Sequence, residues 1–239
     1  MVLPFKDEDG SKKEQVARMF DNISGRYDRL NHLLSLGIDR GWRKKAIKVL
    51  ERHRPGRILD VATGTGDFAI EASRIPGSDI TGVDISEGML ANGRTKIAGL
   101  GLSERVRLVT GDSENLRFED NFFDAVIVAF GVRNFENLEL GISEIRRVLR
   151  PDGILVVLEL SEPENALTGL LYRLYFHRIL PWLGRLVSGD QYAYRYLPDS
   201  VSAFPNGRLF VNVLQKCGFR NCSWKPLTLG TCGLYVASK

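Results

Sequence analysis

The feature that most constrains the fold of this chain is a glycine-rich turn between an apolar run and a helix-like pattern. The run Arg57–Ala62 (RILDVA) leads into the turn Thr63–Gly66 (TGTG), and the helical pattern begins at Asp67. Glycine lets a backbone approach a ligand closely, and Asp84 follows about 20 residues later, where dinucleotide-binding proteins place an acid that binds a ribose. The pattern predicts a nucleotide-type ligand and keeps an NAD-dependent oxidoreductase as one interpretation. Glycines that only tighten a turn are the structural alternative.

Strand-like and helix-like runs alternate through the middle of the chain, which predicts an α/β fold with a mostly parallel sheet and right-handed crossovers. In such a sheet the ligand lies beyond the carboxyl ends of the strands, at the point where the strand order reverses. The expected strands are Arg57–Ala62, Asp79–Ile85, Arg105–Asp112, Phe123–Phe130 and Gly153–Leu160, and the expected helices are Asp67–Arg74, one after an N-cap at Ser86, and Asn137–Arg150.

Further elements flank this core on both sides. Two helices are expected before it, a segment rich in aromatics and arginine after its fifth strand, and then a helix and two strands that close the sheet edge with an antiparallel strand. We predict one domain over residues 1–239, made of an N-terminal helical cap (1–55), a cofactor-binding core (56–161), a helical lid (162–205) and a final helix with edge strands (206–239). The flanking elements are Glu14–Asp21, Gly41–Glu51, Leu167–Val187, Asn206–Lys216, Asn221–Pro226 and Cys232–Ser238.

The net charge of +4 is too small to indicate a nucleic-acid partner, although it is unevenly distributed. Residues 161–239 contain nine Lys or Arg against four Asp or Glu, so the basic excess lies in the last third. No apolar run reaches the roughly 18 residues of a membrane span. The charged N-terminus lacks a secretory apolar region, so we expect a cytoplasmic protein.

No metal site is expected. The cysteine spacings match neither a disulfide framework nor a Cys-x-x-Cys metal motif, and the histidines are scattered. These residues are Cys217, Cys222, Cys232, His32, His53 and His177.

Asp60 and the turn that follows it resemble the first motif of class I methyltransferases, which bind S-adenosylmethionine. That ligand has an ammonium and a sulfonium where a dinucleotide has a pyrophosphate, and an acid beside the turn suits such cations. The third strand ends in Gly111-Asp112-Ser113, a position where these methyltransferases hold a polar or acidic residue against the adenine amino group.

The expected roles follow from the chemistry of that cofactor. Main-chain groups of the turn face the methionine end, and the Asp84 carboxylate accepts hydrogen bonds from both ribose hydroxyls. A helix-cap role is the alternative for Asp84, and an ordinary turn aspartate is the alternative for Asp112. The expected cofactor-binding residues are Gly64, Thr65, Gly66, Asp84, Asp112 and Ser113.

Five motifs in one order make the resemblance more specific. The loop after the fourth strand, VAFGVRN, lacks the Asp/Asn-Pro-Pro-aromatic motif of many N-methyltransferases. Together with four other segments it resembles the menaquinone/ubiquinone biosynthesis C-methyltransferase family, from about Val16 to the end of the chain. The segments are Phe20–Asn31 (FDNISGRYDRLN), Leu36–Arg43 (LGIDRGWR), Asp60–Asp67 (DVATGTGD), Phe130–Asn134 (FGVRN) and Tyr194–Ser200 (YRYLPDS).

The resemblance implies a class I Rossmann-like fold and methylation of a ring carbon of a polyprenylated quinol by S-adenosylmethionine, with S-adenosylhomocysteine as product. The expected reaction is demethylmenaquinol to menaquinol, with a benzoquinol of the ubiquinone pathway as a further acceptor and another small molecule as the alternative. It also implies cofactor contacts from Thr65, Asp84, Asp112 and Ser113, and association through the C-terminal region as a homodimer. Thr63 and Ala129 depart from the glycine and serine of some relatives, so no cofactor role is transferred to Ala129.

Two residues are candidates for catalysis. A ring carbon becomes nucleophilic when its hydroquinol loses a phenolic proton, and Arg133 is placed to stabilise the developing phenolate. Tyr27 and Asn31 are expected to close over the site from the N-terminal helices. The alternatives are a surface arginine and helix packing. Asp67 is interpreted as a helix N-cap, and no base is identified.

The segment Leu167–Val187 has the composition of an interfacial helix. It contains Arg173, Arg178 and Arg185 among leucines and aromatics and no acid, and Pro181 interrupts any single helix. We expect a lid over the acceptor cavity that also contacts the membrane surface transiently. A helix that packs on the sheet with its arginines in solvent is the alternative.

Overall fold

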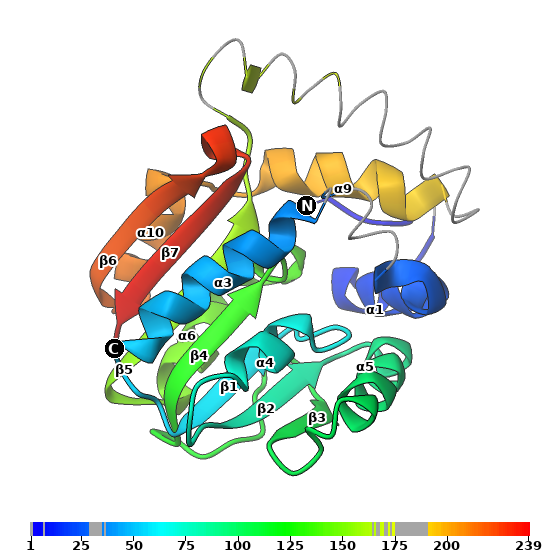
Figure 1. The fold of residues 1–239 in the computed structure, drawn as a ribbon. Coiled ribbons are helices and arrows are strands. Elements are labelled where there is room, and N and C mark those ends of the chain that lie inside the picture. The colour runs from blue at the N-terminus through cyan, green and yellow to red at the C-terminus, as the bar shows by residue number, and fades with distance from the viewer. Residues whose placement is uncertain are drawn as a thin grey trace.

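The computed structural model describes residues 2–6, 8–28, 35, 37–163, 165, 168–169, 172, 174 and 191–239. Its centre is a seven-stranded sheet in the order β3-β2-β1-β4-β5-β7-β6 (Figure 1). Strands β1 to β5 are parallel, and β7 pairs antiparallel with both β5 and β6, as expected for a mostly parallel sheet with an antiparallel strand at one edge. The strands are β1 (Arg57–Val61), β2 (Asp79–Asp84), β3 (Val106–Thr110), β4 (Phe123–Ala129), β5 (Leu149–Leu160), β6 (Arg220–Leu227) and β7 (Cys232–Ser238).

Helices cover both faces of the sheet, because successive strand residues point to opposite sides and both sides are apolar. Ile58 packs with Trp42 and Leu90 on the face covered by α3, α4 and α5, whereas Leu59 packs with Ile142 on the face covered by α6 and α10. The helices are α1 (Lys12–Ile23), α3 (Ile38–Glu51), α4 (Asp67–Ala72), α5 (Glu87–Gly99), α6 (Leu138–Val148), α9 (Gln191–Ala203) and α10 (Arg208–Lys216).

Most element boundaries lie within two residues of the expectation, and the starts of α3 and β5 differ by three and four residues for identifiable reasons. Helix α3 begins at Ile38 rather than Gly41, because Gly37 adopts a left-handed conformation (φ 73°) that starts the helix. Strand β5 begins at Leu149 rather than Gly153, because Leu149 already pairs with Phe123 before the register shifts. The backbone between Leu149 and Gly153 is irregular, with Asp152 at φ 61°.

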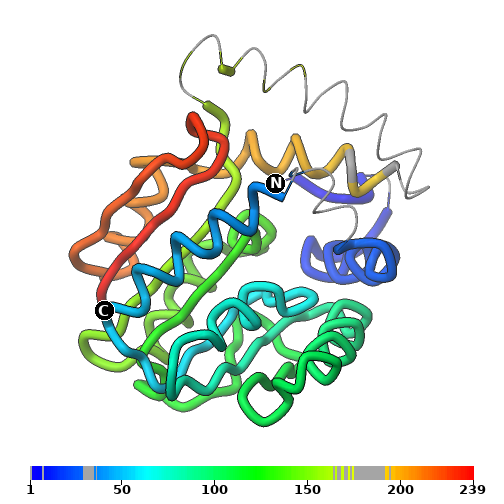
Figure 2. Tube along the Cα trace, viewed as in Figure 1, coloured from blue at the N-terminus to red at the C-terminus, as the bar shows by residue number. Residues whose placement is uncertain are grey.

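The N-terminal helix and α9 lie side by side beyond the carboxyl ends of the strands, although they are far apart in the sequence (Figure 2). They share an apolar cluster that includes Phe5, Val16, Met19 and Tyr196. Of the segment expected to touch a membrane, only residues 168–169, 172 and 174 are described. Among the described helices, none combines the length and the apolar character required to cross a bilayer.

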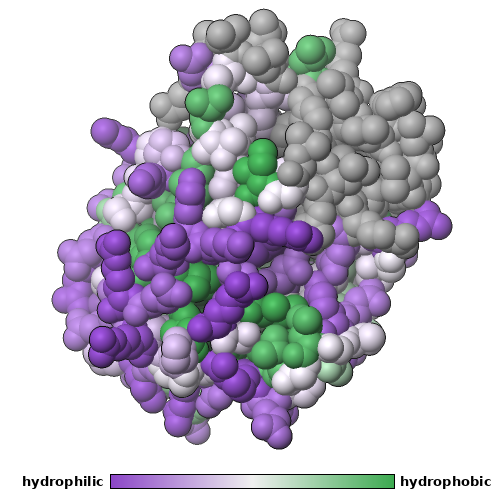
Figure 3. Space-filling model, in the orientation of Figure 1, coloured by the Kyte–Doolittle hydropathy of each residue, from purple (hydrophilic) through white to green (hydrophobic). Residues whose placement is uncertain are grey.

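The outer side of α3 is strongly basic. Arg40, Lys44, Lys45 and Lys48 are all exposed there. Hydrophilic side chains accordingly dominate the described part of the face drawn in Figure 3. The same helix turns Trp42, Arg43 and Asp39 inward, so its buried side is also partly charged.

Candidate active site

A cavity of about 910 Å³, its open mouth included, lies at the carboxyl ends of β1 to β4. The position beside β1 is the point where the strand order reverses, which is where sheets of this kind bind their ligands. Val16 and Phe20 of α1 line it from one side, and Phe130 and Gly131 line it from the end of β4. The ligand site expected from the sequence is therefore a real cavity.

The glycine turn forms one wall of this cavity. Gly64 and Thr65 line it, whereas Gly66 does not and instead forms the N-cap of α4 at φ 80°. The turn is held by hydrogen bonds from Thr63 N–H to Val83 O at 3.0 Å and from Gly66 N–H to Thr63 O at 2.9 Å. A Cβ on Gly64 would lie 3.2 Å from Met89 Cε, so the space at the turn is tight.

Asp84 also lines the cavity, at the end of β2. Its two oxygens accept from Gly64 N–H at 2.8 Å and from Ser86 N–H at 2.9 Å. Burial raises the pKa of this carboxyl. The helix-cap alternative is wrong, because Ser86 caps α5 itself through Met89 N–H at 3.2 Å. A carboxylate has about four acceptor sites, so Asp84 keeps capacity for a ligand.

Asp112 and Ser113 line the cavity from the end of β3. Asp112 accepts from Glu114 N–H at 2.9 Å, so it is a turn aspartate as well as a cavity residue. Its other oxygen accepts from Lys13 Nζ of α1, and this hydrogen bond raises the pKa of the lysine. The sequence contained no signal for Lys13, because nothing local connects the first helix to the third strand.

Asp60 lies deeper, at the end of β1, and its side chain is almost fully buried. One carboxylate oxygen accepts from Thr63 Oγ1 at 2.6 Å, and the other forms no hydrogen bond of normal geometry within the described residues, although the Ala69 N–H lies close enough to lower the pKa. Desolvation raises the pKa of Asp60 to about 7. An unpaired buried carboxylate oxygen at a cavity wall fits a cationic group of a ligand.

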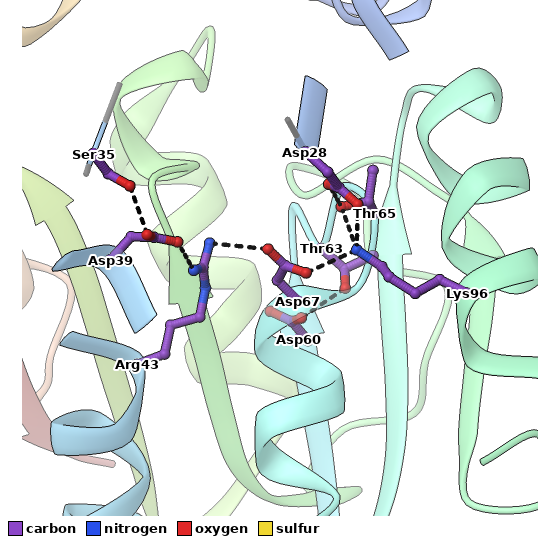
Figure 4. Close-up of polar contacts among 9 residues, drawn as sticks. All are labelled: Asp28, Ser35, Asp39, Arg43, Asp60, Thr63, Thr65, Asp67 and Lys96. Carbon is purple, nitrogen blue, oxygen red and sulfur yellow. Dashed lines mark hydrogen bonds and ion pairs between the residues drawn. The ribbon is translucent and has the colours of Figure 1, made fainter. Parts of the chain in front are cut away.

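Asp67 is not the helix cap that its position suggested, since Gly66 occupies that position and no side chain caps α4. The carboxylate accepts instead from Lys96 Nζ at 2.7 Å (Figure 4). The same ammonium donates to Asp28 Oδ2 at 2.6 Å and to Thr65 Oγ1 at 3.1 Å. The Thr65 hydroxyl is thus used to fix the turn, and Lys96 was not found from the sequence.

Arg43 approaches the cavity from α3 on the other side of Asp67. Its Nη1 donates to Asp39, whose other oxygen accepts from Ser35 at 2.6 Å. The motif that ends at Arg43 supported the family resemblance, but its periodicity gave no indication that this arginine lines the cavity.

Arg133 is buried, so the surface-arginine alternative is wrong. Its Nη1 donates to Glu159 Oε1 at 2.7 Å and to Phe130 O, and its backbone N–H donates to Glu159 Oε2 at 3.2 Å. Desolvation, the largest single influence, lowers the pKa of Arg133. The charge of the fully buried Glu159, its hydrogen bond, and Tyr196 and Tyr27 together outweigh desolvation, so the pKa is raised. Arg133 itself does not line the cavity, whereas Phe130, Gly131 and Asn134 next to it do.

Tyr27 and Asn134 line the cavity beside that wall. Burial raises the pKa of Tyr27 to about 12, so its phenol stays protonated at neutral pH. Asn134 Oδ1 accepts from the Tyr196 hydroxyl of α9 at 3.1 Å. Asn31, expected to join Tyr27, lies outside the described residues.

Comparisons with known proteins agree with this geometry. The model of the ubiE/COQ5 methyltransferase family matches residues 8–239. A demethylmenaquinone methyltransferase of Bacteroides fragilis is 50% identical over 239 residues, covering 100% of this chain and 97% of the relative. A ubiquinone/menaquinone biosynthesis C-methyltransferase of Geobacter sulfurreducens is 45% identical, covering 95% and 90%.

Among solved structures, a SAM-dependent methyltransferase of Thermotoga maritima has a TM-score of 0.66 at 20% identity, covering 93% of this chain and 99% of its own. This likeness supports the fold, a class I methyltransferase sheet with helices on both faces. The family match over nearly all of the sequence, together with relatives of nearly the same length, leads to one conclusion: the chain belongs to the ubiE/COQ5 methyltransferase family.

Proposed function

We propose that this protein uses S-adenosylmethionine to methylate a ring carbon of a polyprenylated quinol, converting demethylmenaquinol to menaquinol. Family membership supports the reaction class, and the names of the full-length relatives support the acceptor. The observation in the structure that most supports the cofactor is the buried, unpaired oxygen of Asp60 beside the glycine turn.

The charge of the cavity favours a cationic cofactor over a dinucleotide. Its lining includes the acids Asp60, Asp67, Asp84, Asp112, Glu114 and Glu136 against the two cations Lys13 and Arg43. A pyrophosphate would be repelled by this excess of carboxylates, whereas a sulfonium and an ammonium are attracted. Asp84 is the candidate for the ribose hydroxyls, and Asp112 and Ser113 are the candidates for the adenine.

Bound S-adenosylmethionine supplies an electrophilic methyl group, and the residues at the end of β4 prepare the acceptor. Arg133 remains a positive charge because Glu159 stabilises it, and its Nε has no partner among the described residues. A preorganised guanidinium of this kind stabilises a developing phenolate. Tyr27 and the Asn134 amide supply neutral hydrogen-bonding groups at the same wall. No residue of this wall is assigned as the base.

Two measurements test the proposal. Calorimetry should detect binding of S-adenosylhomocysteine and none of NAD. The purified protein should then transfer a labelled methyl group to a reduced short-chain demethylmenaquinone analogue, and mass spectrometry with NMR should locate the methyl on a ring carbon. Methyl transfer to oxygen, or NAD binding without S-adenosylhomocysteine binding, would contradict the proposal.

A benzoquinol is a second candidate acceptor, because the Geobacter relative is named for both quinone pathways. Offering both quinols at equal concentration and comparing kcat/KM separates the two. Higher kcat/KM for the naphthoquinol is the expected result.

The membrane surface is a proposed transient partner, since the acceptor is an apolar lipid. Leu174 and Tyr192, at the two ends of the segment outside the described residues, are 50% and 53% exposed. Sedimentation with anionic vesicles that high salt reverses is the expected behaviour, and equal sedimentation with neutral vesicles would contradict it. A homodimer is a further proposal, which analytical ultracentrifugation tests.

A further inference from the structure

We propose that Arg43 of α3 binds the carboxylate of the cofactor's amino-acid end, opposite the ammonium that Asp60 attracts, so that the two side chains form one zwitterion-binding subsite. This inference rests on the proposed function and extends it to a residue outside the core of the sheet. It assigns part of the cofactor site to the N-terminal cap.

The hydrogen-bonding state of the Arg43 guanidinium is the first support. Nη1 donates to Asp39, but Nε is buried and has no partner among the described residues. Nη2 lies 3.6 Å from Asp67 Oδ2, an ion-pair distance that is too long for a hydrogen bond. Nε and Nη2 form one edge of the planar fork, and this edge matches the two oxygens of a carboxylate.

The surroundings of Arg43 are the second support. Its side chain is only 7% exposed, so water does not replace the missing partner freely. The neighbouring acids are already engaged, since Asp39 accepts from Ser35 at 2.6 Å and Asp67 accepts from Lys96 at 2.7 Å. A buried donor edge left open beside satisfied acids is unfavourable unless a ligand completes it.

The relation to Asp60 is the third support. Both residues line the same cavity, and in each of them a buried polar atom has no partner within the described chain. One is a donor on a cation and the other is an acceptor on an acid. A ligand that places a carboxylate near the first and an ammonium near the second satisfies both, and the α-amino acid group of S-adenosylmethionine has this pair of charges.

A chemical double-mutant cycle tests the inference by calorimetry, without turnover. The ligands are S-adenosylhomocysteine and its decarboxylated analogue, which keeps the amine and lacks only the carboxylate. Wild-type protein should bind the first about 10- to 100-fold more tightly, the range expected for hydrogen bonds between charged groups. In Arg43→Met the two ligands should bind within about threefold of each other, because the partner of the carboxylate is gone.

Lys44→Met is the matched control, because Lys44 is the exposed next residue of the same helix. It should discriminate between the ligands like the wild type. Arg43→Lys keeps a charge for Asp39 but lacks the planar edge, so it should lose most of the discrimination even if Arg43→Met does not fold.

Two results would overturn the inference. One is equal binding of both ligands by the wild type, and the other is undiminished discrimination in either folded Arg43 variant. Failure of the proposed function has a different signature, namely no binding of S-adenosylhomocysteine by the wild type.

Discussion

The proposed cofactor side of this cavity, at the ends of β1 to β3, and the proposed acceptor side, at the end of β4, are constructed differently. On the cofactor side, groups of neighbouring strand ends bond one another directly, as Asp84 does with Gly64 N–H across β2 and β1. On the acceptor side, contacts also join segments far apart in the sequence, as the Tyr196 hydroxyl does with Asn134 and Lys12 Nζ with Phe135 O. The glycine turn and Asp84 are thus built locally by the sheet, with Lys13 and Arg43 added to the lining from α1 and α3, whereas the Asn134 side depends on α1 and α9.

This difference affects how amino-acid substitutions act on the two sides of the cavity. A turn between adjacent strands keeps its geometry as long as the sheet forms, which suits the proposed role of holding the cofactor, the ligand that stays constant in the reaction. The acceptor wall depends on α1 and α9, and Lys12 of α1 fixes the β4 loop by donating to Arg133 O at 3.0 Å and Phe135 O at 2.8 Å. Changes in α9 can therefore alter the proposed acceptor site while the glycine turn and Asp84 keep their positions.

The largest expected effect belongs to the acceptor side. Arg133→Lys keeps a charge for buried Glu159 but lacks the fork, so turnover should fall about 100- to 1,000-fold, as for loss of an oxyanion donor. The affinity for S-adenosylhomocysteine, measured by calorimetry, should stay within about twofold of the wild-type value. A twofold change is well below the tenfold change that corresponds to about 1.4 kcal/mol. Arg107→Lys, on the exposed surface of β3, is the control and should change neither quantity. Weaker cofactor binding in Arg133→Lys would erase the distinction between the two sides.

The reverse pattern is expected for Asp84→Ala. This change removes the proposed ribose acceptor and releases Gly64 N–H, so affinity for S-adenosylhomocysteine should fall about 100-fold, equivalent to two charge-assisted hydrogen bonds. Asp79→Ala alters the exposed first residue of the same strand and should leave affinity unchanged. Unchanged calorimetric affinity in Asp84→Ala would remove this residue from the site.

The pH dependence of cofactor affinity tests the proposed role of Asp60 separately from the other residues of the cofactor side. The pKa of Asp60 is raised from 3.8 to about 7 in the folded, ligand-free protein. Between these two pH values the folded protein binds one proton more than the unfolded chain does, so its stability falls as the pH rises. A ligand ammonium prefers the carboxylate form, so cofactor affinity should rise about 20-fold from pH 5.5 to 7.5 as Asp60 ionises. Calorimetry on Asp60→Asn should give a flat profile over the same interval. A profile as steep as that of the wild type would assign the titration to another group.

The smallest effect concerns the junction between α1 and the core. A Cβ on Gly88 would lie 3.0 Å from Asp21 Oδ1 and 3.0 Å from Ser24 Oγ, whereas one on Gly99 of the same helix meets nothing within 4 Å. Gly99→Ala should stabilise the protein by up to about 1 kcal/mol through helix propensity. Gly88→Ala should be less stable than Gly99→Ala by about 1 kcal/mol, because it disturbs the Asp21 contact with Gly88 N–H. Denaturant unfolding measures both, and equal stabilities would mean that α1 does not constrain α5.

Sequence alone identified five residues that the structure brings to one cavity, and their binding of the cofactor stays a prediction. Gly64, Thr65, Asp84, Asp112 and Ser113 all line one cavity, because each follows the end of a strand whose apolar pattern is visible in the chain. Parallel strands bring their carboxyl ends together, so knowing the strands is enough to bring these residues together. Gly66 was the exception, since it caps α4 rather than lining the cavity.

Only the tertiary structure decided the remaining features. Lys13 on Asp112, Lys96 on Asp67 and Glu159 on Arg133 are pairs separated by 99, 29 and 26 residues, and no periodicity predicts which charges meet. The same holds for the open edge of Arg43, which depends on which of its neighbours are already engaged. Local patterns determine where strands and turns form, because the backbone preferences act over a few residues. The choice of partner for each buried charge is a property of the whole packed chain, because desolvation and distance are set only when all elements are in place.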